Sequence, residues 1–319
     1  MLKVENLTKI YGDKRAVDNI SFTLPEGRAI GFVGPNGAGK STTMNMITGY
    51  IEATSGKIAL DDIDVSEKPI EYKSKIGYLP EIPPLYVDMT IMEYLSFVSS
   101  IKLPKGADTE TECKRVMKLT GIEQVSGRLI RNMSKGYRQR IGLAQAIIGS
   151  PKLIILDEPT IGLDPAQVIE FRNLLYKLKK DHTILLSSHI LSEITEICDE
   201  ILMLNEGRLI ASGTAEELLA KATAKSEKGI LETNADKKTV EEAVKSIDGM
   251  MGIKHLGYSS GSVGRYAYEF QIGKKVNGTI VKNLVERGWN VERIETKTAN
   301  LEDVFMMLTD NTKKGKRKK

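Results

Sequence analysis

Cysteine is scarce in this sequence of 319 residues, which contains only Cys113 and Cys198. The two lie far apart and form no C-x-x-C pattern, so a disulfide framework and a zinc site are both disfavoured and a reducing compartment is indicated. No apolar run reaches the roughly 18 residues of a membrane-spanning helix. The first residues, MLKVENLTKIYG, lack the apolar core of a signal peptide. We therefore expect a soluble, cytosolic protein that reaches a membrane only through a partner.

A large excess of one charge is also missing. The chain has 46 Lys and Arg against 42 Asp and Glu, a net charge of +4, and six of the basic residues stand in the last seven, KKGKRKK. Without that tail the net charge is −2, which argues against a nucleic-acid-binding body. Hydrophobic residues make up 41% and charged residues 28%, so a large core is possible and global disorder is excluded.

The first 220 residues alternate short β-branched segments with helical patterns, as α/β folds do. A strand is predicted over 28–33, directly before a glycine-rich turn. The apolar segments 153–156 and 183–186 do not alternate, which is typical of strands buried on both faces. An amphipathic helix is predicted between Asp164 and Lys180, with Asp164 as its N-cap and a proline at the first helical position.

The pattern changes near residue 220. Residues 221–228 are small or charged and favour a linker. Residues 229–310 then follow the order β-α-β-β-α-β, with YSSGSVG as a turn between the middle strands, and end in a short helix at LEDVFMML. This order is typical of a small ferredoxin-like α+β domain. Residues 311–319 are predicted to be a disordered basic tail.

The most informative motif is GPNGAGKST, which satisfies G-x-x-x-x-G-K-S/T between a predicted strand and a predicted helix. Its glycines let backbone N–H groups surround phosphate oxygens, and the helix N-terminus adds a partial positive charge. Lys40 should reach the β- and γ-phosphates, and the Ser41 hydroxyl should bind Mg²⁺. The predicted phosphate-binding residues are Gly34, Asn36, Gly37, Ala38, Gly39, Lys40, Ser41 and Thr42.

A second motif, LIILDEPT, combines an apolar strand with two acids at its carboxyl end. Asp157 could hold Mg²⁺ through water, and Glu158 could act as general base toward an attacking water. An Asp-Glu pair at a strand end is common, and the phosphate loop upstream is what favours the catalytic interpretation.

Five motifs in one order, GPNGAGKST, MSKGYRQR, LIILDEPT, IGLD and LLSSH, resemble the ATP-binding cassette of ABC transporters. The resemblance covers residues 1 to about 220, with a helical subdomain at about 82–150. GYLPE and SKGYRQRIGLAQA resemble the ATP-binding subunits of type-2 exporters, including multidrug-type and gliding-motility-associated systems. The resemblance implies ATP and Mg²⁺ as cofactors and ATP hydrolysis as the reaction.

The resemblance also implies a site shared between two cassettes. The family signature Leu-Ser-Gly-Gly-Gln stands here as Met133–Tyr137, with Ser134 and Gly136 retained and Lys135 and Tyr137 departing from it. In the family, the helix that begins there contacts the γ-phosphate held by the opposite subunit. A homodimer, or a heterodimer with a similar ATPase, is therefore expected.

Four further residues match family positions. Glu81 stands where the family usually has a glutamine that senses Mg²⁺, His189 matches the histidine that contacts the γ-phosphate, and Asp164 matches a loop that crosses between subunits. Tyr11 stands where an aromatic ring stacks on adenine. Each has a plain structural alternative: a surface acid, a core histidine, a helix cap and an edge-strand tyrosine.

The implied partner is a transmembrane permease subunit, which in the family inserts a helix into the helical subdomain. The chain would then be peripheral on the cytoplasmic face of the membrane and would drive export. The basic tail could also bind anionic lipid. Two other functions stay open: a soluble cassette ATPase acting on ribosomes or DNA, and a non-enzymatic regulator acting through its C-terminal domain.

Overall fold

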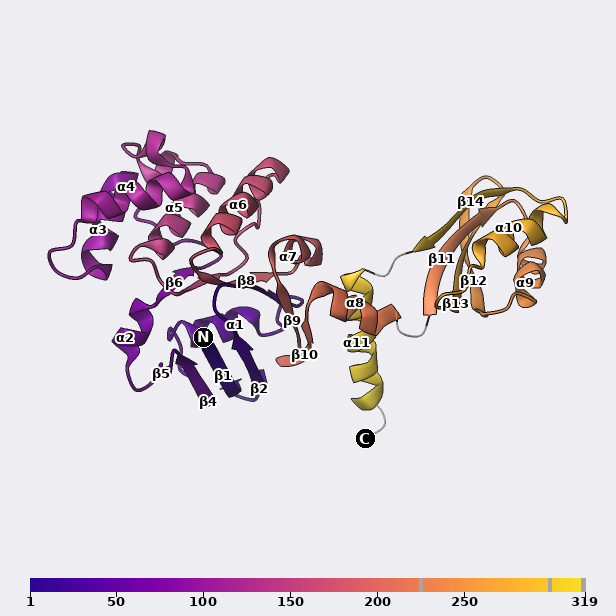
Figure 1. Ribbon diagram of the computed structural model, residues 1–319, viewed down its shortest axis with the longest axis horizontal. Helices are drawn as coiled ribbons and strands as arrows, with labels where there is room; N and C mark the ends of the chain where they lie inside the picture. The colour runs from indigo at the N-terminus through magenta and orange to yellow at the C-terminus, as the bar shows by residue number, and fades with distance from the viewer. Residues whose placement is uncertain (224–225, 298–299, 317–319) are drawn as a thin grey trace. The chain divides into compact units, whose positions relative to one another are not determined.

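The computed structural model describes residues 1–223, 226–297 and 300–316. It divides into two compact units, Met1–Ala215 and Glu216–Lys319 (Figure 1). Within the described residues, no helix combines the length and the apolar character that crossing a bilayer requires.

The first unit contains two sheets. The larger has the strand order β10-β9-β3-β8-β7-β6, and all its pairs are parallel except β9 with β10. The smaller is antiparallel, with the order β2-β1-β4-β5. The strands are β1 Leu2–Tyr11, β2 Lys14–Leu24, β3 Ala29–Val33, β4 Ser55–Leu60, β5 Ile63–Asp64, β6 Ile76–Leu79, β7 Leu153–Leu156, β8 Thr183–Ser188, β9 Glu200–Asn205 and β10 Arg208–Gly213.

Helices of the first unit fall into two groups. Helices α3, α4 and α5 pack on one another as a helical subdomain, while the others connect strands of the sheets (Figure 1). They are α1 Lys40–Ile47, α2 Pro69–Ser74, α3 Ile91–Lys102, α4 Thr109–Thr120, α5 Lys135–Ile147, α6 Pro165–Leu178 and α7 Leu191–Ile197, with short 3-10 turns η1 Glu123–Val125 and η2 Ile130–Asn132.

The central strands of the larger sheet are apolar because both of their faces are covered. Every residue of β3 and of β7 is buried, as the lack of alternation predicts. Helix α6 begins as expected: the Asp164 carboxylate accepts a hydrogen bond from the Gln167 N–H at 2.9 Å, and Pro165 follows it. The α/β architecture predicted for this part of the chain is confirmed.

The second unit contains one antiparallel sheet with the order β12-β13-β11-β14. Its core includes Leu231, Tyr266, Tyr268 and Phe270 from the sheet, together with buried residues of two helices. The elements are α8 Ala215–Thr223, β11 Ser226–Thr233, α9 Lys237–Lys245, β12 Met250–Ser260, β13 Val263–Gln271, α10 Asn277–Val285, β14 Val291–Lys297 and α11 Leu301–Lys316.

Three local expectations differ from the structure. The segment predicted as a linker is mostly regular, because α8, rich in the helix formers Ala, Glu and Leu, reaches Thr223, and β11 begins at Ser226; residues 224–225 lie outside the described residues. The predicted turn YSSGSVG is shorter, since β12 continues to Ser260 and Gly261, at φ 53°, makes the turn. Helix α11 continues to Lys316, so the basic segment is helical that far. Residues 317–319, where the rest of the predicted tail falls, lie outside the described residues.

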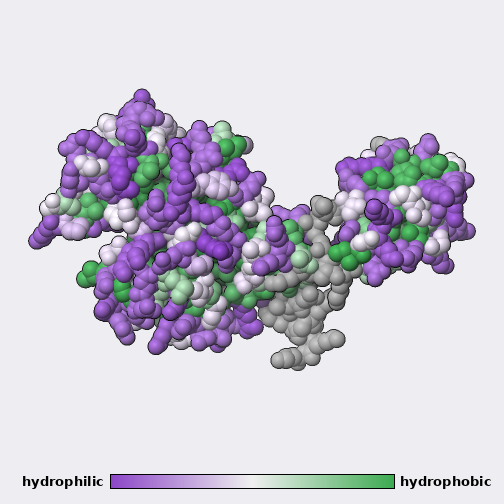
Figure 2. All heavy atoms as spheres, in the orientation of Figure 1, coloured by the Kyte–Doolittle hydropathy of each residue, from purple (hydrophilic) through white to green (hydrophobic). Residues whose placement is uncertain are grey.

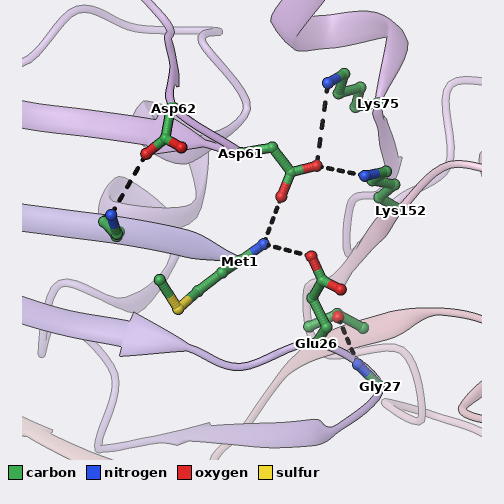
Figure 3. A network of polar contacts seen from close by, with 9 residues as sticks. Met1, Glu26, Gly27, Asp61, Asp62, Lys75 and Lys152 are labelled. Carbon is green, nitrogen blue, oxygen red and sulfur yellow. Dashed lines mark hydrogen bonds and ion pairs between the residues drawn. The ribbon is translucent and has the colours of Figure 1, made fainter.

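Asp61 connects the smaller sheet to the larger one (Figure 3). It stands in the turn between β4 and β5, and its carboxylate lies 2.6 Å from Lys152 Nζ and 4.0 Å from Lys75 Nζ, the residues before β7 and β6. The Met1 ammonium lies 2.5 Å away. The hydrogen bonds from Lys152 and Met1 lower the pKa of Asp61 from 3.8 to about 2.

We expect Asp61→Asn to lower the free energy of unfolding by about 1 kcal/mol at pH 7, because the exposure of Lys152 limits the stabilisation that the ion pair provides. A carboxyl whose pKa is lowered by folding stabilises the protein above its unfolded pKa and loses that effect as the pH falls through the folded value. The difference between wild type and variant should therefore shrink between about pH 4 and pH 2. Calorimetric unfolding across this pH range measures it.

The matched control is Asp62→Asn, which removes the more exposed contact with Lys3 at 3.4 Å and should change little. If the free energies of unfolding of wild type and Asp61→Asn differ by a constant amount down to pH 2, the lowered pKa of Asp61 is contradicted.

Candidate functional site

The glycine-rich segment Gly34–Thr42 directly follows the buried strand β3, and its last three residues begin helix α1, so the predicted order of strand, turn and helix is present. We call this segment the phosphate loop. It borders a cavity of about 490 Å³. The predicted site residues that line this cavity are Asn36, Gly37, Gly39, Lys40, Ser41, Thr42, Glu81, Glu158 and His189.

Close packing explains why the phosphate loop needs glycine. Gly39 has φ 102°, and a Cβ there would lie 2.6 Å from the Ala16 carbonyl oxygen. A Cβ on Gly34 would lie 2.4 Å from the Leu204 carbonyl oxygen. A larger residue at either position would push the loop away from the strands behind it.

Lys40 places a cation inside this cavity. Its side chain is only 6% exposed and donates a hydrogen bond to the Gly34 carbonyl oxygen at 2.7 Å. Its Nζ also lies 3.4 Å from Glu158 Oε1. A buried ammonium needs such oxygen partners, and phosphate oxygens are chemically equivalent partners.

Ser187 joins the two acids after β7. Its hydroxyl donates to Asp157 Oδ1 at 2.5 Å and accepts the Glu158 N–H at 2.8 Å. Glu158 has φ 47°, which is unfavourable for a residue with a side chain. Sequence reasoning missed this serine, and its only signal was its place in the motif LLSSH.

Glu158 and His189 are in direct contact at the wall of the cavity. Glu158 Oε2 lies 2.8 Å from His189 Nδ1, and the Glu158 side chain is 10% exposed while that of His189 is 41% exposed. The carboxylate is thus placed between the Lys40 ammonium and an imidazole. Such a carboxylate can accept a proton at a point that both the solvent and a bound ligand can reach.

A second residue that sequence reasoning missed supports the turn that carries His189. Glu193 of α7 accepts a hydrogen bond from Thr160 Oγ1 at 2.7 Å and one from Ser188 Oγ at 3.4 Å. Ser188 Oγ also accepts the Ile190 N–H at 3.0 Å. An acid in the first turn of a short helix gives no sequence signal for such a role.

Glu81 is exposed on the loop after β6 and lines the same cavity. The same loop packs on helix α5: a Cβ on Gly142 would lie 2.9 Å from Pro83 Cβ. Glu81 thus belongs to a segment that contacts both the cavity and the helical subdomain.

Seven predicted residues do not line this cavity, and one of them is Asp157, which precedes the lining residue Glu158 and accepts the Ser187 hydroxyl hydrogen bond. Ala38 is buried inside the phosphate loop, and Gly34 begins it. Ser134 caps α5, accepting the Tyr137 N–H at 3.4 Å, and Asp164 caps α6. The others are Gly136, packed beside the Gln167 side chain, and Tyr11.

Tyr11 ends strand β1 and is 50% exposed. The Lys9 ammonium lies 5.2 Å from the centre of its ring. Lys14, the cross-strand partner of Tyr11 on β2, lines the cavity. Tyr11 is therefore one strand away from the cavity.

The few protein oxygens near the cavity suit Mg²⁺, which takes most of its ligands from phosphate and water, better than they suit a metal ion that is bound by protein ligands alone. The described residues contain no group of three or more His, Cys, Asp or Glu side chains placed to hold a metal ion. Mg²⁺ usually takes one or two protein oxygens and completes its shell with phosphate and water. Ser41 lines the cavity, and Asp157, whose carboxylate Ser187 orients, precedes Glu158.

Comparison with known proteins gives consistent matches. Residues 17–161 match the family described as ABC transporter. The chain is 31% identical to the uncharacterized ABC transporter ATP-binding protein YxlF of Bacillus subtilis (strain 168), over 96% of this chain and 98% of that one. It is 32% identical to the bacitracin transport ATP-binding protein BcrA of Bacillus licheniformis, over 97% of each chain.

A solved structure resembles the first unit. It is the dimeric post-hydrolysis state of the ATP-binding cassette MJ0796 bound to ADP and Pi, with a TM-score of 0.62 and 25% identity. The match covers 67% of this chain and 98% of that one.

Proposed function

This chain belongs to the ABC transporter ATP-binding proteins, and on that premise we propose that it drives export by hydrolysing ATP between two copies of its cassette. The family provides ATP binding and hydrolysis, a dimeric cassette and a permease partner. The direction of transport, the role of each residue and the use of Mg²⁺ are the parts that we add.

One observation carries the catalytic proposal: Glu158 lies between Lys40, at 3.4 Å, and His189, at 2.8 Å, beside a glycine-rich phosphate loop. In this arrangement Lys40 neutralises charge on the β- and γ-phosphates. Glu158 accepts the proton of the attacking water, and His189 orients the γ-phosphate. The water oxygen bonds to the γ-phosphorus as its bond to the bridging oxygen breaks, releasing ADP and phosphate.

Ser41 and Asp157 are the residues that would hold Mg²⁺, with Glu81 contacting it through water. When bound, this cation neutralises charge on the phosphate oxygens. Ser187 keeps the Asp157 carboxylate in one orientation through its 2.5 Å hydrogen bond.

The second half of the site comes from the other cassette. Ser134 and Gly136 begin helix α5 yet do not line the cavity of their own chain. A helix N-terminus attracts anions, and Ser134 at this one is exposed, so we place it against the γ-phosphate held by the other copy. Asp164 caps α6, and we place the loop that it ends at the same interface. Tyr11 stacks on the adenine ring.

The permease subunit docks on the helical subdomain, and the chain lies on the cytoplasmic face of the membrane. Exposed aromatic and apolar residues gather before and on α3, and Figure 2 shows a hydrophobic area there. Tyr86 is 55% exposed, and its ring lies 5.6 Å from that of Phe97. Exposed apolar groups of this kind mark protein contacts.

Two other assignments belong to this proposal. The strand order β12-β13-β11-β14, with helix α9 after β11 and helix α10 after β13, supports a ferredoxin-like second unit.

Full-length similarity to transporter subunits disfavours the other two functions, a soluble ATPase acting on ribosomes or DNA and a purely regulatory protein.

We expect Glu158→Gln to lower the ATP turnover rate by at least about a hundredfold, because the amide cannot accept the proton. ATP binding should persist, since Lys40 and the phosphate loop are unchanged, and the ATP-bound dimer should accumulate. Phosphate release and size-exclusion chromatography with light scattering measure the two effects. Wild-type turnover by this variant would contradict the role of Glu158 as base.

We also expect a photo-crosslinking amino acid at position 86, in the cell of origin, to capture an integral membrane protein. The same substitution at Tyr176, which is 44% exposed on α6, is the matched control and should not. Mass spectrometry identifies the product. Capture from position 176 and not from position 86 would place the permease contact elsewhere.

A further inference from the structure

The turn between β9 and β10 lies directly behind the phosphate loop. The Gly207 N–H donates a hydrogen bond to the Ala38 carbonyl oxygen at 3.0 Å. Gly207 has φ 78°, and a Cβ there would lie 2.8 Å from the Ala16 carbonyl oxygen, so only glycine fits this contact.

This contact fixes the direction of an amide that faces the cavity. A peptide group is planar and trans, so its carbonyl oxygen and its N–H point in opposite directions. The Ala38 carbonyl points to Gly207, and the N–H of the same peptide, on Gly39, therefore points away from Gly207. Gly39 lines the nucleotide cavity.

Asp18 fastens Gly207 from the other side. Its backbone N–H donates to the Gly207 carbonyl oxygen at 2.8 Å. Its carboxylate accepts from Arg208 Nε at 2.7 Å and lies 2.6 Å from the second Arg208 nitrogen. Both Arg208 nitrogens therefore meet the same oxygen, Oδ2, in a charge-assisted contact. Arg15 donates to the other carboxylate oxygen at 2.7 Å.

Partial burial gives this ion pair more weight than a fully solvated one. The Asp18 side chain is 11% exposed, whereas Arg208 is 64% exposed. Neither residue lines the nucleotide cavity. An effect of the pair on ATP is therefore indirect, and the hydrogen bonds of Gly207 to Asp18 and Ala38 connect the pair to the phosphate loop.

We propose that Asp18 and Arg208 are positioning residues that hold Gly207 against Ala38 and so keep the Gly39 N–H directed at the nucleotide phosphates. The inference rests on the proposed ATP site. It adds that the ion pair between Asp18 and Arg208, which lies outside that site, influences the affinity for the nucleotide phosphates.

The test uses Asp18→Asn and Arg208→Gln in the full chain, with titration calorimetry of ATP and ADP and steady-state ATP hydrolysis. Both variants should weaken ATP and ADP binding by about fivefold, the range of a partly exposed ion pair. KM for ATP should rise by a similar factor, while kcat at saturating ATP stays within twofold. The double variant should bind no more weakly than Asp18→Asn alone, because Asp18→Asn already removes the contact with Arg208 together with the one from Arg15.

Asp62→Asn is the matched control, since it removes an exposed Asp–Lys contact of the same sheet and should leave affinity unchanged. If Asp18→Asn does not fold, Arg208→Gln carries the test, because that side chain is largely exposed. Folded variants with wild-type affinity, or with lower kcat at unchanged KM, would overturn the proposal.

Lys40→Ala separates the two levels of inference. If Lys40→Ala abolishes ATP binding while Asp18→Asn and Arg208→Gln bind normally, the ATP site stands and the positioning role fails. If Lys40→Ala binds ATP as tightly as wild type, the proposed site itself is wrong, and the positioning role fails with it.

Discussion

The positive charge of Lys40, held where only 6% of its side chain is exposed, constrains the whole site. A buried ammonium is costly unless oxygen atoms surround it. The Gly34 carbonyl and Glu158 supply these oxygens at 2.7 and 3.4 Å. Phosphate oxygens can pair with the same ammonium, and the proposed role of Glu158 as base requires that exchange of partners.

The larger sheet brings the predicted site residues to one edge. Strands β3, β8, β7 and β6 are neighbours and run parallel, so their carboxyl ends meet at the same side. The phosphate loop follows β3, His189 follows β8, Asp157 and Glu158 follow β7, and Glu81 stands shortly after β6. Ligands of open α/β sheets bind at this edge. The smaller sheet and the turn after β9 then support the phosphate loop from behind.

Local patterns were enough to predict the elements that carry the motifs. The strand 153–156 and the cap at Asp164 follow from an apolar run and from an Asp-Pro pair. The contacts of Ser187, Glu193 and Asp18 join residues about 30 to 190 positions apart, and no periodic sequence pattern predicts contacts of this kind. The hairpin of β12 and β13 is longer than its Gly- and Ser-rich sequence predicts, because pairing along the sheet extends the strand to Ser260.

The central claim is that one cassette cannot complete the reaction alone, since the helix begun by Ser134 must act on the nucleotide of another copy. The most direct test measures ATP hydrolysis per chain over a range of protein concentrations while light scattering follows the dimer fraction. The account predicts that the rate per chain rises and falls with the dimer fraction. An undiminished rate per chain where only monomers are present would contradict it.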